Sequence, residues 1–227
     1  MPPAPHAPSA QSNRPVRYNA RAVARRVRRL TRTYDDVTVV TEREEPRGEF
    51  DRLREHAEEG YIGGAYCWTV RESGQQCEDG RTERDSDADN TESRRPDAGE
   101  SKGSRRRVLL GMRRDRDSWC PPGGEVKGFD PDDADSGERY EEAATRWVRE
   151  ETGVDAEPTE CVFVHWAIVE DPCSEAEVHL AYAVFDAAYC GGRVTIEPDQ
   201  LNGAAWFADL PPNLHYFAQQ RADTWSA

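Results

Sequence analysis

The segment from residue 119 to residue 157 constrains the fold of this chain more than any other part of the sequence. It reads WCPPGGEVKGFDPDDADSGERYEEAATRWVREETGVDAE, and its second half predicts a helix. At about 3.6 residues per turn, Trp147, Glu150 and Glu151 share one face of that helix, so the two carboxylates are presented together. The helix also offers an apolar packing surface made of Ala143, Ala144 and Val148.

Adjacent carboxylates on one helix face repel each other unless a cation lies between them. Hard oxygen ligands suit Mg²⁺ or Mn²⁺, and such an ion can also bridge to the phosphates of a substrate. A diphosphate is therefore the expected partner of an ion held by Glu150 and Glu151. An arbitrary pair of glutamates is more typical of a solvated helix surface, and it is the register of the surrounding residues that favours a site.

That register resembles the Nudix box. The family pattern is Gly, five residues, Glu, seven residues, and then Arg-Glu-aliphatic-x-Glu-Glu-x-Gly-aliphatic. In this chain Glu138 is followed by seven residues and Arg146, and a PPGG sequence precedes them. The other matched positions are Val148, Glu150, Glu151, Gly153 and Val154. The chain is thus similar to Nudix hydrolases over roughly residues 60 to 215.

The resemblance implies an α/β fold, an α/β/α sandwich around a mixed β-sheet. It implies that Glu150 and Glu151 bind Mg²⁺ or Mn²⁺ and act in catalysis together with Arg146, which orients Glu138 or a nearby carboxylate. The implied activity is hydrolysis of the pyrophosphate linkage of a nucleoside diphosphate derivative by a metal-activated water. Tight backbone turns around the site are expected at Gly123, Gly124 and Gly153.

Two features depart from the family pattern. Thirteen residues, Glu125 to Gly137, separate Gly124 from Glu138 where the pattern has five, and we expect this insertion to lengthen the rim of the site without breaking the helix. The second departure is Trp147, which replaces a glutamate that commonly ligates metal or acts as a base. An indole does neither. Weaker metal binding, a base from another loop, or ligand binding without catalysis are the three outcomes that remain open.

Carboxylates elsewhere in the chain are candidates to replace the missing glutamate. A late loop supplies an acidic residue near the metal in many Nudix proteins, which points to Glu197 and Asp199. The predicted hairpin turn offers Glu170, Asp171 and Glu175. Each of these residues is also typical of a solvated loop.

The sequence around the box is typical of β-strands. Residues 65–70 and 106–113 are predicted core strands, and residues 72–105 between them have almost no apolar side chains, which predicts a disordered insertion joining adjacent strands. Residues 160–171 and 176–186 form a predicted hairpin. Its histidines, His165 and His179, are assigned no role.

The ends of the chain are expected to lie outside this domain. Residues 1–15 are predicted to be disordered, residues 16–59 to form a helical basic extension, and residues 216–227 to form a C-terminal helix and tail. Residues 1–33 hold eight arginines and no acidic residue, so with a net charge of −14 for the chain the remainder carries −22. Docking of the basic helix on the acidic domain is favoured over binding to nucleic acid, which weakens as salt rises.

The composition of the chain indicates the salt environment in which the protein is expected to work. Only two of the 30 basic residues are lysines, and such an acidic, lysine-poor chain resembles proteins of salt-in halophiles, in which salt screens self-repulsion. With its degenerate box the chain resembles a haloarchaeal Nudix protein.

The six cysteines form no CxxC pair, which indicates neither a zinc site nor a redox motif. No run approaches the roughly 18 apolar residues of a membrane span, and a cytoplasmic location is expected.

The sequence therefore predicts a Mg²⁺-dependent Nudix hydrolase. The alternative is a catalytically impaired Nudix-fold protein that senses a nucleotide or metabolite, because Trp147 replaces a catalytic glutamate. A DNA-binding protein led by its arginine-rich helix is a third hypothesis, and neither a membrane nor nucleic acid is an expected partner. The substrate's identity and the oligomeric state are not predicted.

Overall fold

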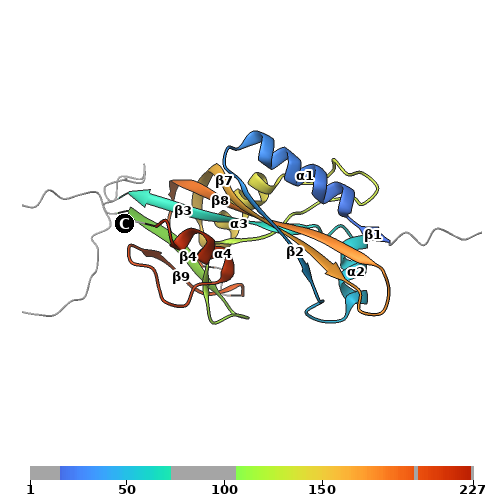
Figure 1. Cartoon of the computed structure of the whole chain (residues 1–227). Coiled ribbons are helices and arrows are strands. Elements are labelled where there is room, and N and C mark those ends of the chain that lie inside the picture. The colour runs from blue at the N-terminus through green and yellow to red at the C-terminus, as the bar shows by residue number, and fades with distance from the viewer. Residues whose placement is uncertain (1–15, 73–105, 197–198, 226–227) are drawn as a thin grey trace, which may run out of the picture.

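A computed structural model of the chain describes residues 16–72, 106–196 and 199–225. In these residues a mixed sheet of nine strands runs through the molecule, with helices on both faces (Figure 1). The strands are β1 (Arg17–Tyr18), β2 (Thr38–Glu44), β3 (Gly63–Glu72), β4 (Arg106–Arg113), β5 (Trp119–Cys120), β6 (Gly123–Glu125), β7 (Val154–Glu170), β8 (Glu177–Gly192) and β9 (Leu201–Phe207). The helices are α1 (Ala20–Thr33), α2 (Phe50–Glu58), α3 (Tyr140–Thr152) and α4 (Tyr216–Ala222).

The predicted hairpin of β7 and β8 is confirmed and forms the longest pairing of the sheet. Strand β2 lies parallel to β7, and β3 lies parallel to the other side of β8. Strand β4 continues the sheet antiparallel to β3, with Val70 opposite Val108, so the two strands that flank the predicted insertion are adjacent as expected. The insertion itself lies outside the described residues, apart from Glu72 at the end of β3.

Successive residues of a strand point to opposite faces of the sheet. Side chains on the two faces therefore form two separate buried layers. Ala65 and Cys67 of β3 belong to the core under α1 and α3. Tyr66 packs with Phe217 of α4 on the other face, where α2 also lies (Figure 1). The predicted α/β/α sandwich is therefore confirmed.

The basic helix α1 is part of this core. Val23 and Leu30 are fully buried against the sheet, while the guanidinium of Arg29 donates to both carboxylate oxygens of Glu141 on α3, at 2.9 and 2.6 Å. The prediction that this helix docks on the acidic domain is thus confirmed. The segment 16–59, predicted as a helical extension, also contributes β1 and β2 to the same sheet.

The two ends of the chain are described only in part. Helix α4 lies where a C-terminal helix was expected, and the prediction of disorder for residues 1–15 falls outside the described residues. A membrane-crossing helix would have to be longer and more apolar than any helix in the described part of the chain.

Candidate functional site

Helix α3 carries the motif as the sequence predicts. It begins at Tyr140, after the inserted residues, and the side chain of Arg26 from α1 donates to the backbone oxygens of Ser136 and Glu138 in the connecting loop. The helix ends at Gly153, which adopts a left-handed conformation with φ of 69°. The insertion therefore lengthens the loop without breaking the helix, and Gly153 makes the expected turn.

Gly123 and Gly124 depart from expectation. They do not form a turn with positive φ but lie in strand β6, which pairs with β3 and passes directly under α3. A Cβ atom on Gly124 would lie 2.4 Å from the ring of Trp147, and one on Gly123 would lie 2.3 Å from the carbonyl oxygen of Ala65. Close approach, rather than backbone conformation, requires glycine at both positions: of Trp147 on α3 to Gly124, and of strand β3 to Gly123.

Glu151 lies at the centre of this contact, with only 1% of its side chain exposed. Its Oε2 accepts a hydrogen bond from the backbone nitrogen of Gly123 at 3.0 Å. The Nη1 atom of Arg113 lies 3.2 Å from Oε1 and donates to the carbonyl oxygen of Gly123 at 2.9 Å. Burial raises the pKa of Glu151 to about 6, although the charge of Arg113 opposes the shift.

Glu138 and Glu150 are joined by Arg146. Its Nε and Nη2 atoms donate to the two oxygens of Glu138 at 2.7 and 2.9 Å, and its Nη1 donates to Glu150 at 3.0 Å. Burial of Glu138 favours its neutral form, but the hydrogen bonds from Arg146 and from the backbone of Lys127 prevail and lower its pKa. The predicted contact between Arg146 and Glu138 is confirmed. Glu150 is 42% exposed and lies 3.6 Å from the ammonium of Lys127.

Trp147 occupies the helix face between these glutamates. Its indole nitrogen donates to the carbonyl oxygen of Glu125 at 2.8 Å, and its ring covers Gly124. The guanidinium of Arg146 and the ammonium of Lys127 lie over the ring, at 4.9 and 5.4 Å from its centre. The single polar atom of this side chain is thus already bonded, and the position offers no oxygen to a metal ion.

The remaining donors fit a divalent cation. Oε1 of Glu151 is buried and forms no hydrogen bond, so it is an acceptor that a cation would satisfy. Glu150, the next residue, supplies a second and more exposed carboxylate. Arg113 already places positive charge beside Glu151. The site therefore offers two carboxylates where the family pattern has three, next to a fixed guanidinium.

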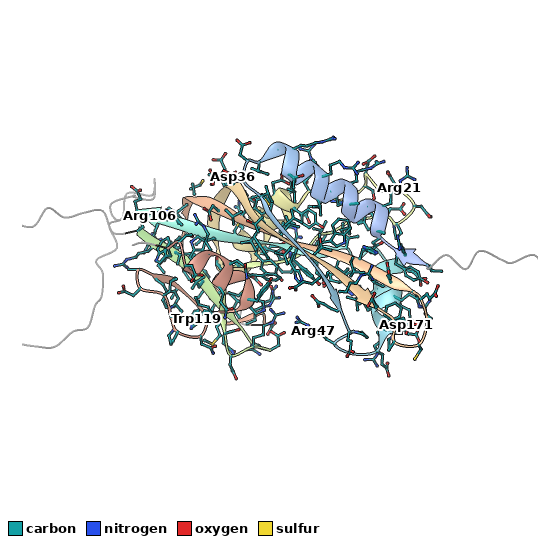
Figure 2. The ribbon with its side chains drawn as sticks, in the orientation of Figure 1. Arg21, Asp36, Arg47, Arg106, Trp119 and Asp171 are labelled. Carbon is teal, nitrogen blue, oxygen red and sulfur yellow. The ribbon has the colours of Figure 1, made fainter. Side chains whose placement is uncertain are left out.

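Two cavities adjoin these residues. The smaller, about 360 Å³, lies over the box and is lined by charged side chains that include Arg113, Asp115 and Lys127. The larger, about 500 Å³, is rich in aromatic and histidine side chains and includes Arg47, which Figure 2 shows between the α2 side and the α4 side of the molecule. Both cavities are lined by Tyr61, Tyr66, Arg116 and Tyr182.

Four of the five carboxylates proposed as substitutes for the missing glutamate belong to the described residues, and none of the four lines either cavity. Asp199 is exposed in the turn before β9 and lines neither cavity, and Glu197 lies outside the described residues. Glu170 pairs with Arg43, while Asp171 and Glu175 lie in the exposed hairpin turn beside β1 and α2 (Figure 1).

Sequence reasoning did not single out the charged residues Arg113, Asp115 and Arg116 of the cavities. They lie in the sequence RRDRDS, which begins at the last residue of β4, and its alternating charges before the PPGG sequence were the available signal. The two hairpin histidines do not face each other, since His165 lies opposite Tyr182 on the neighbouring strand. His179 is hydrogen-bonded to Trp166 at 3.1 Å and contacts Glu177 at 3.2 Å.

Several solved structures are similar to this chain. Among solved structures, the MutT NUDIX hydrolase from Burkholderia pseudomallei is 23% identical, with 71% of this chain and 95% of that chain covered and a TM-score of 0.43. An ADP-ribose pyrophosphatase from Streptococcus suis 89-1591 is 18% identical, covering 72% of this chain and 85% of that one, with a TM-score of 0.36. The MutT protein from Methanosarcina mazei Go1 is 18% identical, covering 73% and 92%, with a TM-score of 0.38.

No curated protein matches the chain. A family model described as the NUDIX domain matches residues 101–219, which is more than half of the sequence and includes β4, the box helix α3, the long hairpin and β9. The chain belongs to the NUDIX family.

Proposed function

We propose that this protein hydrolyses the pyrophosphate linkage of a nucleoside diphosphate derivative with the help of Mg²⁺ or Mn²⁺. Membership of the family supports a pyrophosphohydrolase in general. The observation that carries the finer proposal is the pair of cavities that share Tyr61, Tyr66, Arg116 and Tyr182, with a charged space over the box and an aromatic space beside it. A diphosphate with an attached ring system has this distribution of charge and apolar surface.

The smaller cavity suits the diphosphate. Arg113 and Arg116 present guanidinium groups, and Lys127 adds an ammonium, so each phosphate has a cationic donor within the same space. Tyr66 and Tyr182 continue from there into the larger cavity, where planar side chains favour stacking with a base or another ring. These residues position the linkage over α3.

Glu151 and Glu150 would hold the divalent cation. When bound, such an ion neutralises charge on phosphate oxygens and lowers the pKa of a bound water. Glu151 is held in place by Gly123, and Arg146 keeps Glu138 and Glu150 together, so the carboxylates are oriented before the substrate arrives.

The proton released by the attacking water needs an acceptor other than Trp147. Asp115 and Glu125 are the acidic side chains that line the smaller cavity, and we assign this role to one of them. Of the two, Asp115 is the stronger candidate because it lies beside Arg116, with 3.7 Å between its Oδ2 and the guanidinium Nε, and is therefore close to a phosphate-binding group.

Trp147 also favours a second candidate function, a protein that binds the same derivative as a sensor without cleaving it. The two functions are separated by measuring both binding and monophosphate release for a panel of nucleoside diphosphate derivatives with Mg²⁺ or Mn²⁺. The acidic, lysine-poor composition supports a protein that works in the cytoplasm at high salt, so the assays belong in molar KCl.

We expect wild-type protein to release monophosphate and Trp147→Glu to release it faster, because the substitution restores a carboxylate beside Glu151. Wild-type protein that binds a derivative but releases no monophosphate contradicts the hydrolase proposal. In that case, release by Trp147→Glu alone would identify the sensor.

A further inference from the structure

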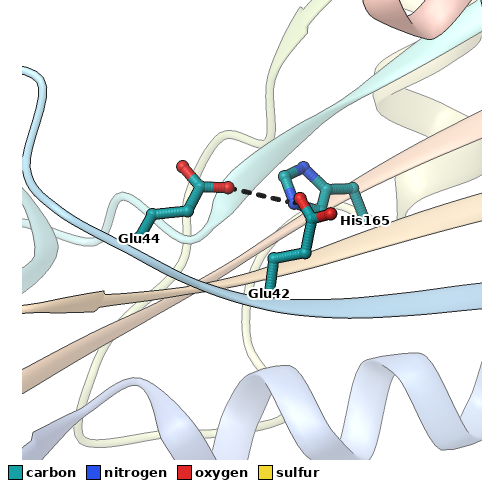
Figure 3. A group of neighbouring side chains, drawn as sticks. All are labelled: Glu42, Glu44 and His165. Atoms are coloured by element: carbon teal, nitrogen blue, oxygen red, sulfur yellow. Dashed lines mark ion pairs between the residues drawn. The ribbon is translucent and has the colours of Figure 1, made fainter.

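A second group of potential ligands lies outside the Nudix box, on strands β2 and β7. Glu42 and Glu44 are two residues apart on β2 and so share a face of the sheet, and His165 lies on the adjacent strand β7 (Figure 3). The Nε2 atom of His165 is 3.0 Å from Oε2 of Glu42 and 3.1 Å from Oε1 of Glu44. Each residue thus offers one ligand atom, and the three atoms lie within 4.8 Å of one another.

His165 lacks a hydrogen bond at the atom that faces this group. Its side chain is only 8% exposed, and its buried Nε2 has no hydrogen-bond partner despite the two nearby oxygens. In the described part of the chain, neither Glu42 nor Glu44 forms an ion pair with an arginine or a lysine. A buried polar atom without a partner is costly, and two neighbouring carboxylates repel each other.

A protonated histidine paired with two glutamates does not account for these contacts. Its N–H would point at one carboxylate, whereas neither oxygen lies in the direction that a hydrogen bond requires. Metal bonds of about 2.0–2.2 Å to nitrogen and oxygen place two ligands roughly 3 Å apart when they meet near a right angle, as they do in an octahedral Mn²⁺ site or a five-coordinate Zn²⁺ site. The separations of Nε2 from both oxygens fit that arrangement, with a cation at the nitrogen lone pair.

We propose that Glu42, Glu44 and His165 bind a divalent transition-metal ion, Zn²⁺ or Mn²⁺. A neutral imidazole with two carboxylates suits these ions better than Mg²⁺, which prefers oxygen ligands alone. Three protein ligands leave coordination positions open. Because Glu44 and His165 line the larger cavity, those positions face the space where a bound derivative would lie, and the ion takes an anionic group of that ligand.

This site is separate from the Nudix box, and its test does not depend on turnover. Binding of Zn²⁺ and of Mn²⁺ to the full chain is measured by calorimetry in a Glu150→Gln, Glu151→Gln background, which removes both box carboxylates. We expect one ion per chain, with affinity at least about tenfold weaker on adding either Glu42→Gln or His165→Gln, each of which removes one ligand. The matched control is Glu157→Gln, an exposed carboxylate on the same strand as His165, which leaves the affinity unchanged.

A nitrogen NMR spectrum of the imidazoles provides a second readout. The lowest Zn²⁺ concentration that saturates the Glu157→Gln control should shift Nε2 of His165 fully in that control and only partly in Glu42→Gln, which binds the ion more weakly. Glu42 is 52% exposed, so its substitution does not threaten folding. The proposal is overturned if the box-deficient chain binds neither ion, or if Glu42→Gln and His165→Gln bind it as tightly as the control.

Discussion

Carboxylates lie close together both at the Nudix box and on strand β2, and their surroundings are opposite. At the Nudix box, Glu151 lies beside Arg113, and Arg146 bridges Glu138 and Glu150. On strands β2 and β7, Glu42 and Glu44 contact the imidazole of His165, and neither forms an ion pair with an arginine or lysine of the described residues. Fixed arginines therefore neutralise the carboxylates of the box, and these side chains can be ordered without a metal ion. The negative charge of Glu42 and Glu44 is instead neutralised by an ion that binds from solution.

The largest expected effect comes from removing the fixed cation of the box. Arg113→Met leaves the buried carboxylate of Glu151 without its partner, and we expect the free energy of unfolding near neutral pH to fall by about 2–4 kcal/mol. The loss should shrink near pH 5, where Glu151 is protonated in the folded state. Chemical denaturation measures both values. Arg149→Met, which removes an exposed partner of Asp155, is the control and should cost less than about 0.5 kcal/mol.

Glu151 itself should make stability depend on pH in an unusual direction. Its pKa is raised from 4.5 to about 6 on folding, so the folded state holds the proton more tightly than the unfolded state. In metal-free buffer its contribution is greatest below the unfolded pKa and is lost as pH rises to about 6, a change of about 2 kcal/mol. The contribution is measured as the unfolding free energy of wild type minus that of Glu151→Gln, which should fall as pH rises. A value that increases with rising pH would show that the side chain is not buried as described.

Glu138 should behave in the opposite way. Its lowered pKa means that the bond to Arg146 stabilises the fold above the unfolded pKa and is lost as pH falls through the folded pKa. We expect Glu138→Gln to lower the free energy of unfolding by about 1–2 kcal/mol near neutral pH and by less in acid. Equal losses at both pH values would mean that the pair contributes by packing rather than by charge.

The smallest effect is expected at the β2–β7 group in metal-free protein. Glu42→Gln should leave the free energy of unfolding within about 0.5 kcal/mol of wild type, or raise it slightly, because it relieves repulsion with Glu44 without breaking a pair to a fixed cation. Denaturation in the presence of a chelator checks this. A loss of unfolding free energy as large as that caused by Glu138→Gln would mean that Glu42 stabilises the metal-free fold as much as a carboxylate of the box does.

Local patterns predicted the elements that carry the box. The spacing from Glu138 to Gly153 was sufficient for helix α3, its left-handed end and the contact of Arg146 with Glu138, since all of these depend on residues near in sequence. Two β-rich runs separated by the short segment PCSE likewise predicted the β7–β8 hairpin.

The distant contacts of Arg113 and of Glu42 were not predicted from the sequence. Arg113 meets Glu151 only because β3 pairs with both β4 and β6, which brings the end of β4 to the helix. Glu42 meets His165 through a parallel pairing of β2 with β7, and no turn links these strands to reveal it in the sequence. The two glycines of β6 were misjudged for the same reason. Glycine is required at position 124 by the indole of Trp147 and at position 123 by the backbone of β3.

The most direct test of hydrolysis at the box is the initial rate of monophosphate release by wild type, Glu151→Gln and Glu157→Gln at saturating Mg²⁺ in molar KCl. If Glu151 holds the ion over the pyrophosphate, Glu151→Gln should lower kcat/KM by at least about 100-fold while Glu157→Gln matches wild type. Turnover that survives Glu151→Gln in a folded protein would contradict the assignment and place the reaction outside the Nudix box.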